Sequence, residues 1–181
     1  MAEKFIKAEL DPRTMPDGEG SERDMLLGFL RWHRETLRLK CSGLEPAQLA
    51  ARAVPPSTMS LLGLVRHLAE VEHGWFRRGL SGMDVPYLYC SKAEPNADFD
   101  GAIPDPDCVA EGWRTWEDAA EFADRLIAEA PSLEAVSMPN RYKPGHRLTL
   151  RWVAFHMIEE YAQHNGHADL LRERIDGRIG L

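Results

Sequence analysis

The chain has 181 residues, of which 44% are apolar and 28% charged, and its formal net charge is −7 at pH 7. This composition excludes a disordered or fibrous chain, and the length leaves little room for two large domains. We expect neither nucleic acid nor a membrane as a partner. The sequence contains no run of basic residues and no apolar stretch of the roughly 20 residues that a membrane helix needs.

Cysteine usage and the N-terminal residues indicate the compartment. The three cysteines, Cys41, Cys90 and Cys108, are widely spaced and form no CxxC pair. An odd number with this spacing predicts neither a disulfide framework nor a zinc ribbon. The first residues are charged and lack the apolar core of a signal peptide. We therefore expect reduced thiols and a cytoplasmic protein.

The N-terminal part of the chain is expected to be an arm followed by a helix. Residues 1–20 are polar and contain two prolines and two glycines, which predicts an irregular arm before a single domain over 21–181. The first helix is expected over 21–42. It begins at Ser21, whose third following residue is acidic as in a capping box, and it ends at Gly43.

Three further helices are predicted along the rest of the chain. They cover residues 60–80, 115–130 and 149–175, and each carries apolar residues at helical spacing. Residues 82–112 between the second and third helices are rich in proline and aspartate, which predicts a long connection. No segment alternates with the period of two that is typical of strands. The pattern predicts an all-α protein, a four-helix bundle in which residues 82–112 form the crossover.

Ionisable residues on the apolar face of the last predicted helix indicate a site. On a helical wheel Glu160 and His164 fall within the apolar stripe, while His156 and His167 flank it. An isolated buried carboxylate costs several kcal/mol, so Glu160 must be protonated, paired or bound to a cation. A structural hydrogen-bonded pair and two ligands of one divalent metal ion both satisfy this requirement.

Histidines on the other helices add to this pattern. His67 lies at the edge of the buried face of the second predicted helix, and His33 points inward from the first. His73 is expected to face solvent, on the side opposite the apolar stripe. A single inward histidine is more often a core residue than a ligand. Three inward histidines and one inward glutamate in a small bundle favour a metal site.

Two segments carry a resemblance to a known family. The segments LLGLVRHLAEVE, residues 61–72, and HMIEEYAQHNGH, residues 156–167, resemble the second and last helices of the DinB/YfiT-like superfamily. Members are four-helix bundles, commonly homodimers, that hold a metal with one histidine from helix two and two ligands four residues apart on the final helix. The resemblance spans about 21–176 and implies His67, Glu160 and His164 as the ligands.

In the final pair of ligands, this chain has glutamate at the first position. This pattern resembles that of mycothiol-dependent maleylpyruvate isomerases and related thiol S-transferases. The resemblance therefore implies a transferase that passes a low-molecular-weight thiol such as mycothiol to a small electrophile. Two histidines and one carboxylate suit zinc, nickel or iron(II). Zinc is preferred because it lowers the pKa of a bound thiol and holds it as the nucleophilic thiolate.

The remaining histidines and the alternative functions complete the prediction. His33 and His156 are expected to transfer protons or to support the ligands as catalytic residues. Three alternatives remain open at this point: an iron-dependent oxygenase-type site, a metal-binding sensor or binding module without turnover, and a purely structural bundle.

Overall fold

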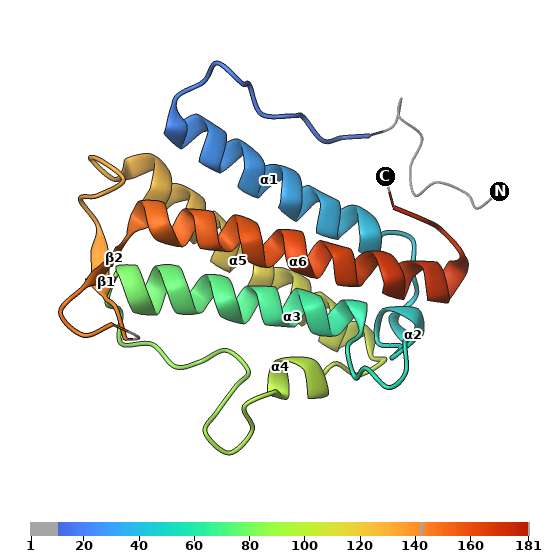
Figure 1. Ribbon diagram of the computed structural model, residues 1–181. Coiled ribbons are helices and arrows are strands. Elements are labelled where there is room, and N and C mark those ends of the chain that lie inside the picture. The colour runs from blue at the N-terminus through green and yellow to red at the C-terminus, as the bar shows by residue number, and fades with distance from the viewer. Residues whose placement is uncertain (1–10, 142, 181) are drawn as a thin grey trace.

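The computed structural model describes residues 11–141 and 143–180, and most of these residues are helical (Figure 1). The long helical segments are α1 (Glu22–Cys41), α3 (Leu61–Glu72) with its π-helical continuation η2 (His73–Leu80), α5 (Pro106–Glu129) and α6 (Leu150–Asp176). Two one-turn helices, α2 (Pro46–Leu49) and α4 (Ala97–Asp100), lie in the connections. Strand β1 (Ser137–Pro139) pairs antiparallel with β2 (Arg147–Thr149). The predicted all-α class is confirmed in the sense of a mostly helical protein.

The long helices lie side by side in two parallel pairs. Helix α1 packs along α6, and α3 with η2 packs along α5, while α3 also contacts α6. Within each pair the helices run in the same direction, and the two pairs run in opposite directions (Figure 1). The connection from Leu80 to Pro106 therefore returns along α3, and its helix α4 packs against α3.

The ends of α1 and α6 follow the predicted capping signals. The Ser21 hydroxyl accepts a hydrogen bond from the Asp24 N–H, and the Asp24 carboxylate accepts one from the Ser21 N–H. At the start of α6 the Thr149 hydroxyl accepts from the Trp152 N–H. Helix α6 ends at Gly177, whose φ of 76° is a left-handed conformation that favours glycine. Both helices match their predicted bounds to within one residue.

The predicted start of the third long helix was wrong. Helix α5 begins at Pro106 rather than near Thr115. The prolines of residues 82–112 predict a connection, but proline is well suited to the first position of a helix because its missing N–H is not needed there. The Asp105 carboxylate caps the helix by accepting hydrogen bonds from the Asp107 and Cys108 N–H groups. The Thr115 hydroxyl instead donates to the Glu111 carbonyl within the helix.

Short elements were also missed. Helices α2 and α4 span four residues each, and the two strands span three residues each. Segments of this length contain too few residues for a helical or alternating pattern to be recognised. The described part of the predicted arm, residues 11–20, forms neither helix nor strand, while residues 1–10 lie outside the described residues.

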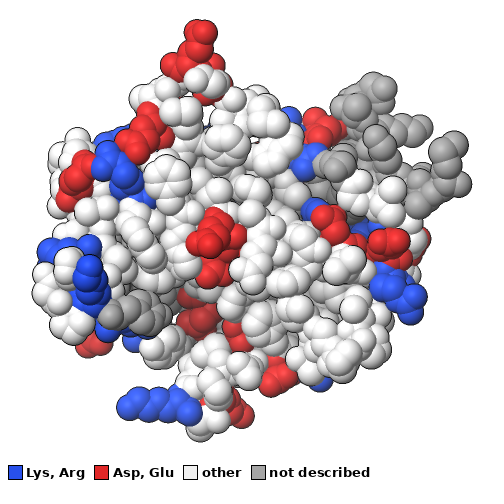
Figure 2. Space-filling view, in the orientation of Figure 1, with Lys and Arg blue, Asp and Glu red and all other residues white. Residues whose placement is uncertain are grey.

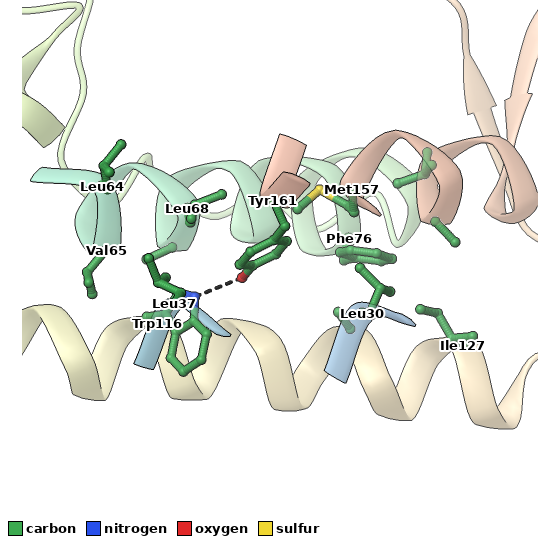
Figure 3. Close-up of a cluster of buried hydrophobic side chains, with 14 of the residues drawn as sticks. Leu30, Leu37, Leu64, Val65, Leu68, Phe76, Trp116, Ile127, Met157 and Tyr161 are labelled. Carbon is green, nitrogen blue, oxygen red and sulfur yellow. Dashed lines mark hydrogen bonds between the residues drawn. The ribbon is translucent and has the colours of Figure 1, made fainter. Parts of the chain in front are cut away.

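The core lies between the long helices and contains a polar network around Tyr161. Figure 3 shows Trp116 of α5 donating its indole N–H to the Tyr161 hydroxyl, with a nitrogen–oxygen distance of 2.7 Å. Tyr161 in turn donates to the Glu72 carboxylate, which pairs with Arg34 of α1 at 2.6 Å. Glu72 is 0% exposed and Arg34 5% exposed. The network therefore joins all four long helical segments through buried side chains.

The distribution of charged side chains on the surface is consistent with the net charge of −7. On the face shown in Figure 2 acidic and basic side chains form small separate groups rather than one basic surface. No helix within the described residues is long and apolar enough to cross a membrane. All three cysteines are unpaired, and Cys41 is buried.

Candidate metal centre

Three predicted ligands meet between α3 and α6. His67 projects from α3, and Glu160 and His164 project from successive turns of α6 because residues four apart share one face of a helix. One donor atom from each residue lies within 4.8 Å of the other two. The imidazole rings of His67 and His164 have centroids 4.7 Å apart. Packing of α3 against α6 thus produces a cluster of two imidazoles and one carboxylate.

The spacing is compatible with a bound metal ion. Nitrogen and oxygen ligands lie about 2.0–2.2 Å from zinc, so tetrahedral ligands are separated by about 3.4 Å. Side-chain adjustments of about 1 Å would bring donors 4.8 Å apart to this separation. The cluster therefore has the donor chemistry of a two-histidine, one-carboxylate site, and small side-chain adjustments would give it the spacing.

Asp98 of α4 holds the ring of His67 from behind. The His67 Nδ1–H donates to the Asp98 carboxylate at 2.8 Å, and Phe99 stacks on the same ring with centroids 4.7 Å apart. Burial tends to raise the pKa of Asp98, but the hydrogen bonds from His67 and from the Phe99 N–H outweigh it and lower that pKa. With Nδ1 protonated, Nε2 of His67 carries the lone pair that a metal ligand needs.

Glu160 lies between two histidines. Its carboxylate oxygens are 3.6 Å from Nε2 of His164 and 3.3 Å from Nε2 of His156. The neighbouring His164 lowers the pKa of Glu160, partly opposed by burial, and the charge of His156 acts in the same direction as His164. The Glu160 side chain is 24% exposed, so it is less buried than the helical wheel predicted. It therefore presents an ionised carboxylate at the edge of the core.

The other inward histidines lie outside this three-residue cluster. Nδ1 of His167 is 3.3 Å from Nδ1 of His164, so one of these two nitrogens carries the hydrogen. His33 lies against Asn165, whose side-chain amide donates to the His33 carbonyl at 3.0 Å. Burial, followed by the charge of Lys40, lowers the pKa of His33. His33 is thus held as a neutral imidazole between α1 and α6.

A pocket of about 540 Å³ opens beside Glu160. Its lining includes Trp75, Arg78, Tyr87, Met138, His156 and Glu160. His156 stacks on Trp152 with ring centroids 5.0 Å apart and meets Trp75 edge-on at 5.1 Å. Glu160 is thus the cluster residue that this pocket reaches, and Trp75 and His156 give the pocket an aromatic side.

The prediction that His73 faces solvent was wrong. His73 is 5% exposed, and its Nε2 hydrogen-bonds to the Pro86 carbonyl at 2.8 Å. Glu70, on the same side of α3, accepts hydrogen bonds from three consecutive backbone N–H groups, those of residues 88–90. The crossover covers this side of α3, whereas a helical wheel assumes only one buried face.

The sequence analysis missed Asp98 and Arg78. Asp98 was counted only as one acidic residue of a long connection, and Arg78 was not singled out. The spacing of Asp98 along the chain does not relate it to His67, because α4 reaches α3 only when the crossover folds back. A buried acidic residue in a proline-rich connection is visible only in the tertiary structure.

The fold and the cluster together define a helical protein with a candidate metal centre beside a pocket of about 540 Å³. A family model described as mycothiol-S-transferase matches residues 25–177. The chain therefore belongs to this mycothiol S-transferase family, a DinB/YfiT-like family, and the resemblance seen in the sequence is confirmed. No curated protein matches the chain.

Proposed function

We propose that this protein is a metal-dependent mycothiol S-transferase with the four-helix bundle of the DinB/YfiT-like type. His67, Glu160 and His164 are the proposed metal ligands. The observation that carries the proposal is the convergence of these three donors within 4.8 Å of one another, in a chain whose family is described by mycothiol transfer.

Zinc is the metal that we propose for this site. When bound, zinc lowers the pKa of a thiol and keeps it as the nucleophilic thiolate near neutral pH. The Asp98 carboxylate sets the tautomer of His67 so that its Nε2 faces the cluster. Glu160 supplies the anionic oxygen, which is consistent with its lowered pKa.

The pocket beside Glu160 is the proposed site of the electrophile. In a substitution, the thiol sulfur forms a bond to the electrophilic carbon, and the leaving group departs with the bonding electron pair. In an addition to a double bond, the same sulfur–carbon bond forms and a proton is delivered to the neighbouring carbon. His156 lines this pocket and is the residue that we propose for proton transfer. His33 remains a second proposal for this role.

The ligand proposal is tested with two substitutions of Glu160. Glu160→Gln keeps the shape but removes the anionic oxygen, so zinc affinity should fall by about tenfold or more. Glu160→His restores a nitrogen donor and should retain zinc with altered transferase activity. Glu159→Gln is the matched control, since Glu159 immediately precedes Glu160 in α6 and its side chain is 77% exposed. Elemental analysis and melting temperature with and without chelator provide the readouts.

The outcomes separate a metal centre from a structural pair. Full zinc content in Glu160→Gln, with an unchanged response to chelator, would remove Glu160 from the ligands. Zinc binding by the wild-type protein without transfer of mycothiol to any of a panel of electrophiles would favour a binding or sensing module. Iron in place of zinc, with redox activity, would favour the oxygenase-type site.

We further propose that the protein acts in the cytoplasm as a homodimer, with residues 21–181 as its single domain. Light scattering at micromolar concentration should give the mass of two chains. The mass of one chain would contradict the dimer.

A further inference from the structure

The pocket beside the candidate metal centre contains an arginine, Arg78, that has no acidic partner among the described residues. Arg78 projects from η2, and its guanidinium carbon lies 3.5 Å from the centre of the Tyr87 ring. Its Nη1 is buried and has no hydrogen-bond partner among the described residues. A buried donor left unsatisfied destabilises the folded protein, because the hydrogen bond that it made with water is not replaced. A cost of this kind is recovered when a ligand supplies the missing acceptor.

Four other buried or half-buried arginines pair with carboxylates, unlike Arg78. Arg34 pairs with Glu72, Arg66 with Glu111, and Arg172 with Asp176. Arg77, the neighbour of Arg78 in η2, pairs with Asp118 of α5 at 2.8 Å. In the described part of the chain, no carboxylate lies within ion-pair distance of Arg78. Of these five described arginines, only Arg78 lacks a carboxylate partner.

The charge of the pocket favours an anion. Arg78 and Arg141 both line it, and Glu160 is the one acidic residue among its described lining residues. If Glu160 is a metal ligand, its charge is already neutralised by the cation, so the described lining of the pocket leaves the positive charge of Arg78 uncompensated in a protein of net charge −7. Figure 2 shows basic side chains at the end of the molecule where Figure 1 places the β1–β2 hairpin.

The rest of the pocket suits a flat, unsaturated molecule. Trp75 and Tyr87 contribute aromatic rings, and Met138 of β1 adds an apolar side chain. Gly79 of η2 allows the hairpin to approach closely, because a Cβ at this position would lie 2.6 Å from the Met138 sulfur. A volume of about 540 Å³ is in the usual range for small-molecule sites.

We propose that Arg78 binds a carboxylate of the electrophile, so that the substrates of this protein are small, flat electrophiles that carry a carboxylate. This inference rests on the transferase function proposed above. A planar guanidinium can donate two parallel N–H groups to one carboxylate, whereas the ammonium group of lysine acts as a point charge and cannot form this pair of hydrogen bonds. Arg78 therefore acts as the specificity-determining residue, and the carbon to be attacked lies on the Glu160 side of the pocket.

A matched pair of electrophiles tests the proposal with mycothiol as the thiol. The pair is 4-(chloromethyl)benzoate and its methyl ester. In both reactions the thiol sulfur bonds to the benzylic carbon, chloride leaves with the electrons of the carbon–chlorine bond, and the thiol proton passes to solvent. Because a charge-assisted hydrogen bond contributes about 1.5–3 kcal/mol, Arg78→Gln should lower kcat/KM for the acid by about tenfold or more. For the ester the change should stay below about twofold.

Two further variants distinguish the effect of the positive charge at position 78 from that of the planar pair of donors and from damage to the fold. Arg78→Lys keeps the positive charge but loses the planar pair of donors, so its kcat/KM for the acid should lie between those of wild type and Arg78→Gln. Arg77→Gln is the neighbouring control and should keep the wild-type preference for the acid. Zinc content and melting temperature are measured for every variant. An equal fall for acid and ester, or no change for either, would overturn the proposal.

A binding measurement distinguishes failure of this inference from failure of the proposed function. Calorimetric titration of the zinc-loaded protein with the unreactive 4-methylbenzoate should show binding that Arg78→Gln weakens by about tenfold. If wild type turns over neither electrophile but binds 4-methylbenzoate through Arg78, the transferase function fails and the anion site remains. Equal binding of 4-methylbenzoate by wild type and Arg78→Gln would overturn the anion site itself.

Discussion

Asp98→Ala should weaken zinc binding even though Asp98 contributes no donor atom to the cluster. The Asp98 carboxylate is 4% exposed and accepts the Nδ1–H of His67 at 2.8 Å. Its removal frees the imidazole to rotate and to adopt the other tautomer, in which Nε2 carries the hydrogen. Losing such an outer partner of a metal ligand costs about 10–100-fold in affinity, or about 1.4–2.7 kcal/mol. Asp98→Asn keeps an acceptor oxygen and should fall at the lower end of this range.

The measurement is a zinc titration of the metal-free protein against a competing chelating dye. Asp100→Ala is the control, because Asp100 belongs to the same short helix and its side chain is 60% exposed in a surface pair with Arg52. The melting temperature of each metal-free variant reports any loss of the packing of α4 on α3. A zinc dissociation constant for Asp98→Ala within about twofold of wild type, with the fold intact, would refute the role of Asp98.

The remaining predictions concern stability, thiol reactivity and pH. Glu72→Gln removes the buried anion of Arg34 and leaves only the half-exposed Asp124 as its partner, so urea unfolding should show a loss of about 3 kcal/mol, and a loss below about 1 kcal/mol would contradict this. Burial raises the pKa of Cys41 to about 12, so iodoacetamide at pH 8 should modify Cys41 only after unfolding, as read by mass spectrometry. Because the pKa of His33 is lowered in the folded state, the unfolded chain binds the proton first, and stability should fall as the pH drops below about 6.5. His33→Gln should flatten this decline in melting temperature between pH 7 and 5, and an unchanged slope would count against it.

The helices with strong local signals could be predicted from the sequence. Ser21 and Thr149 provide side-chain caps at the starts of α1 and α6, and Gly177 ends α6 in a left-handed conformation. These signals act over three or four residues, so they need no knowledge of the rest of the chain. The pairing of Glu160 with His164 on one face also follows from helical periodicity alone.

The sequence also indicated that His67 belongs with this pair, through its wheel position and the family resemblance. Its distance from the pair depends on how α3 packs against α6, and the structure brings the three donors together. Whether they hold a metal remains a prediction for the elemental analysis.

Only the tertiary structure decided what lies behind and beside the cluster. The crossover folds back along α3, which buries His73, places Asp98 behind His67 and brings Tyr87 onto Arg78. These contacts join residues from separate elements, and the chain between them adopts its path because of packing rather than local preference. Local sequence therefore determined the helices and the faces of their side chains, while the course of the crossover determined which of those side chains are buried, supported or left open to a ligand.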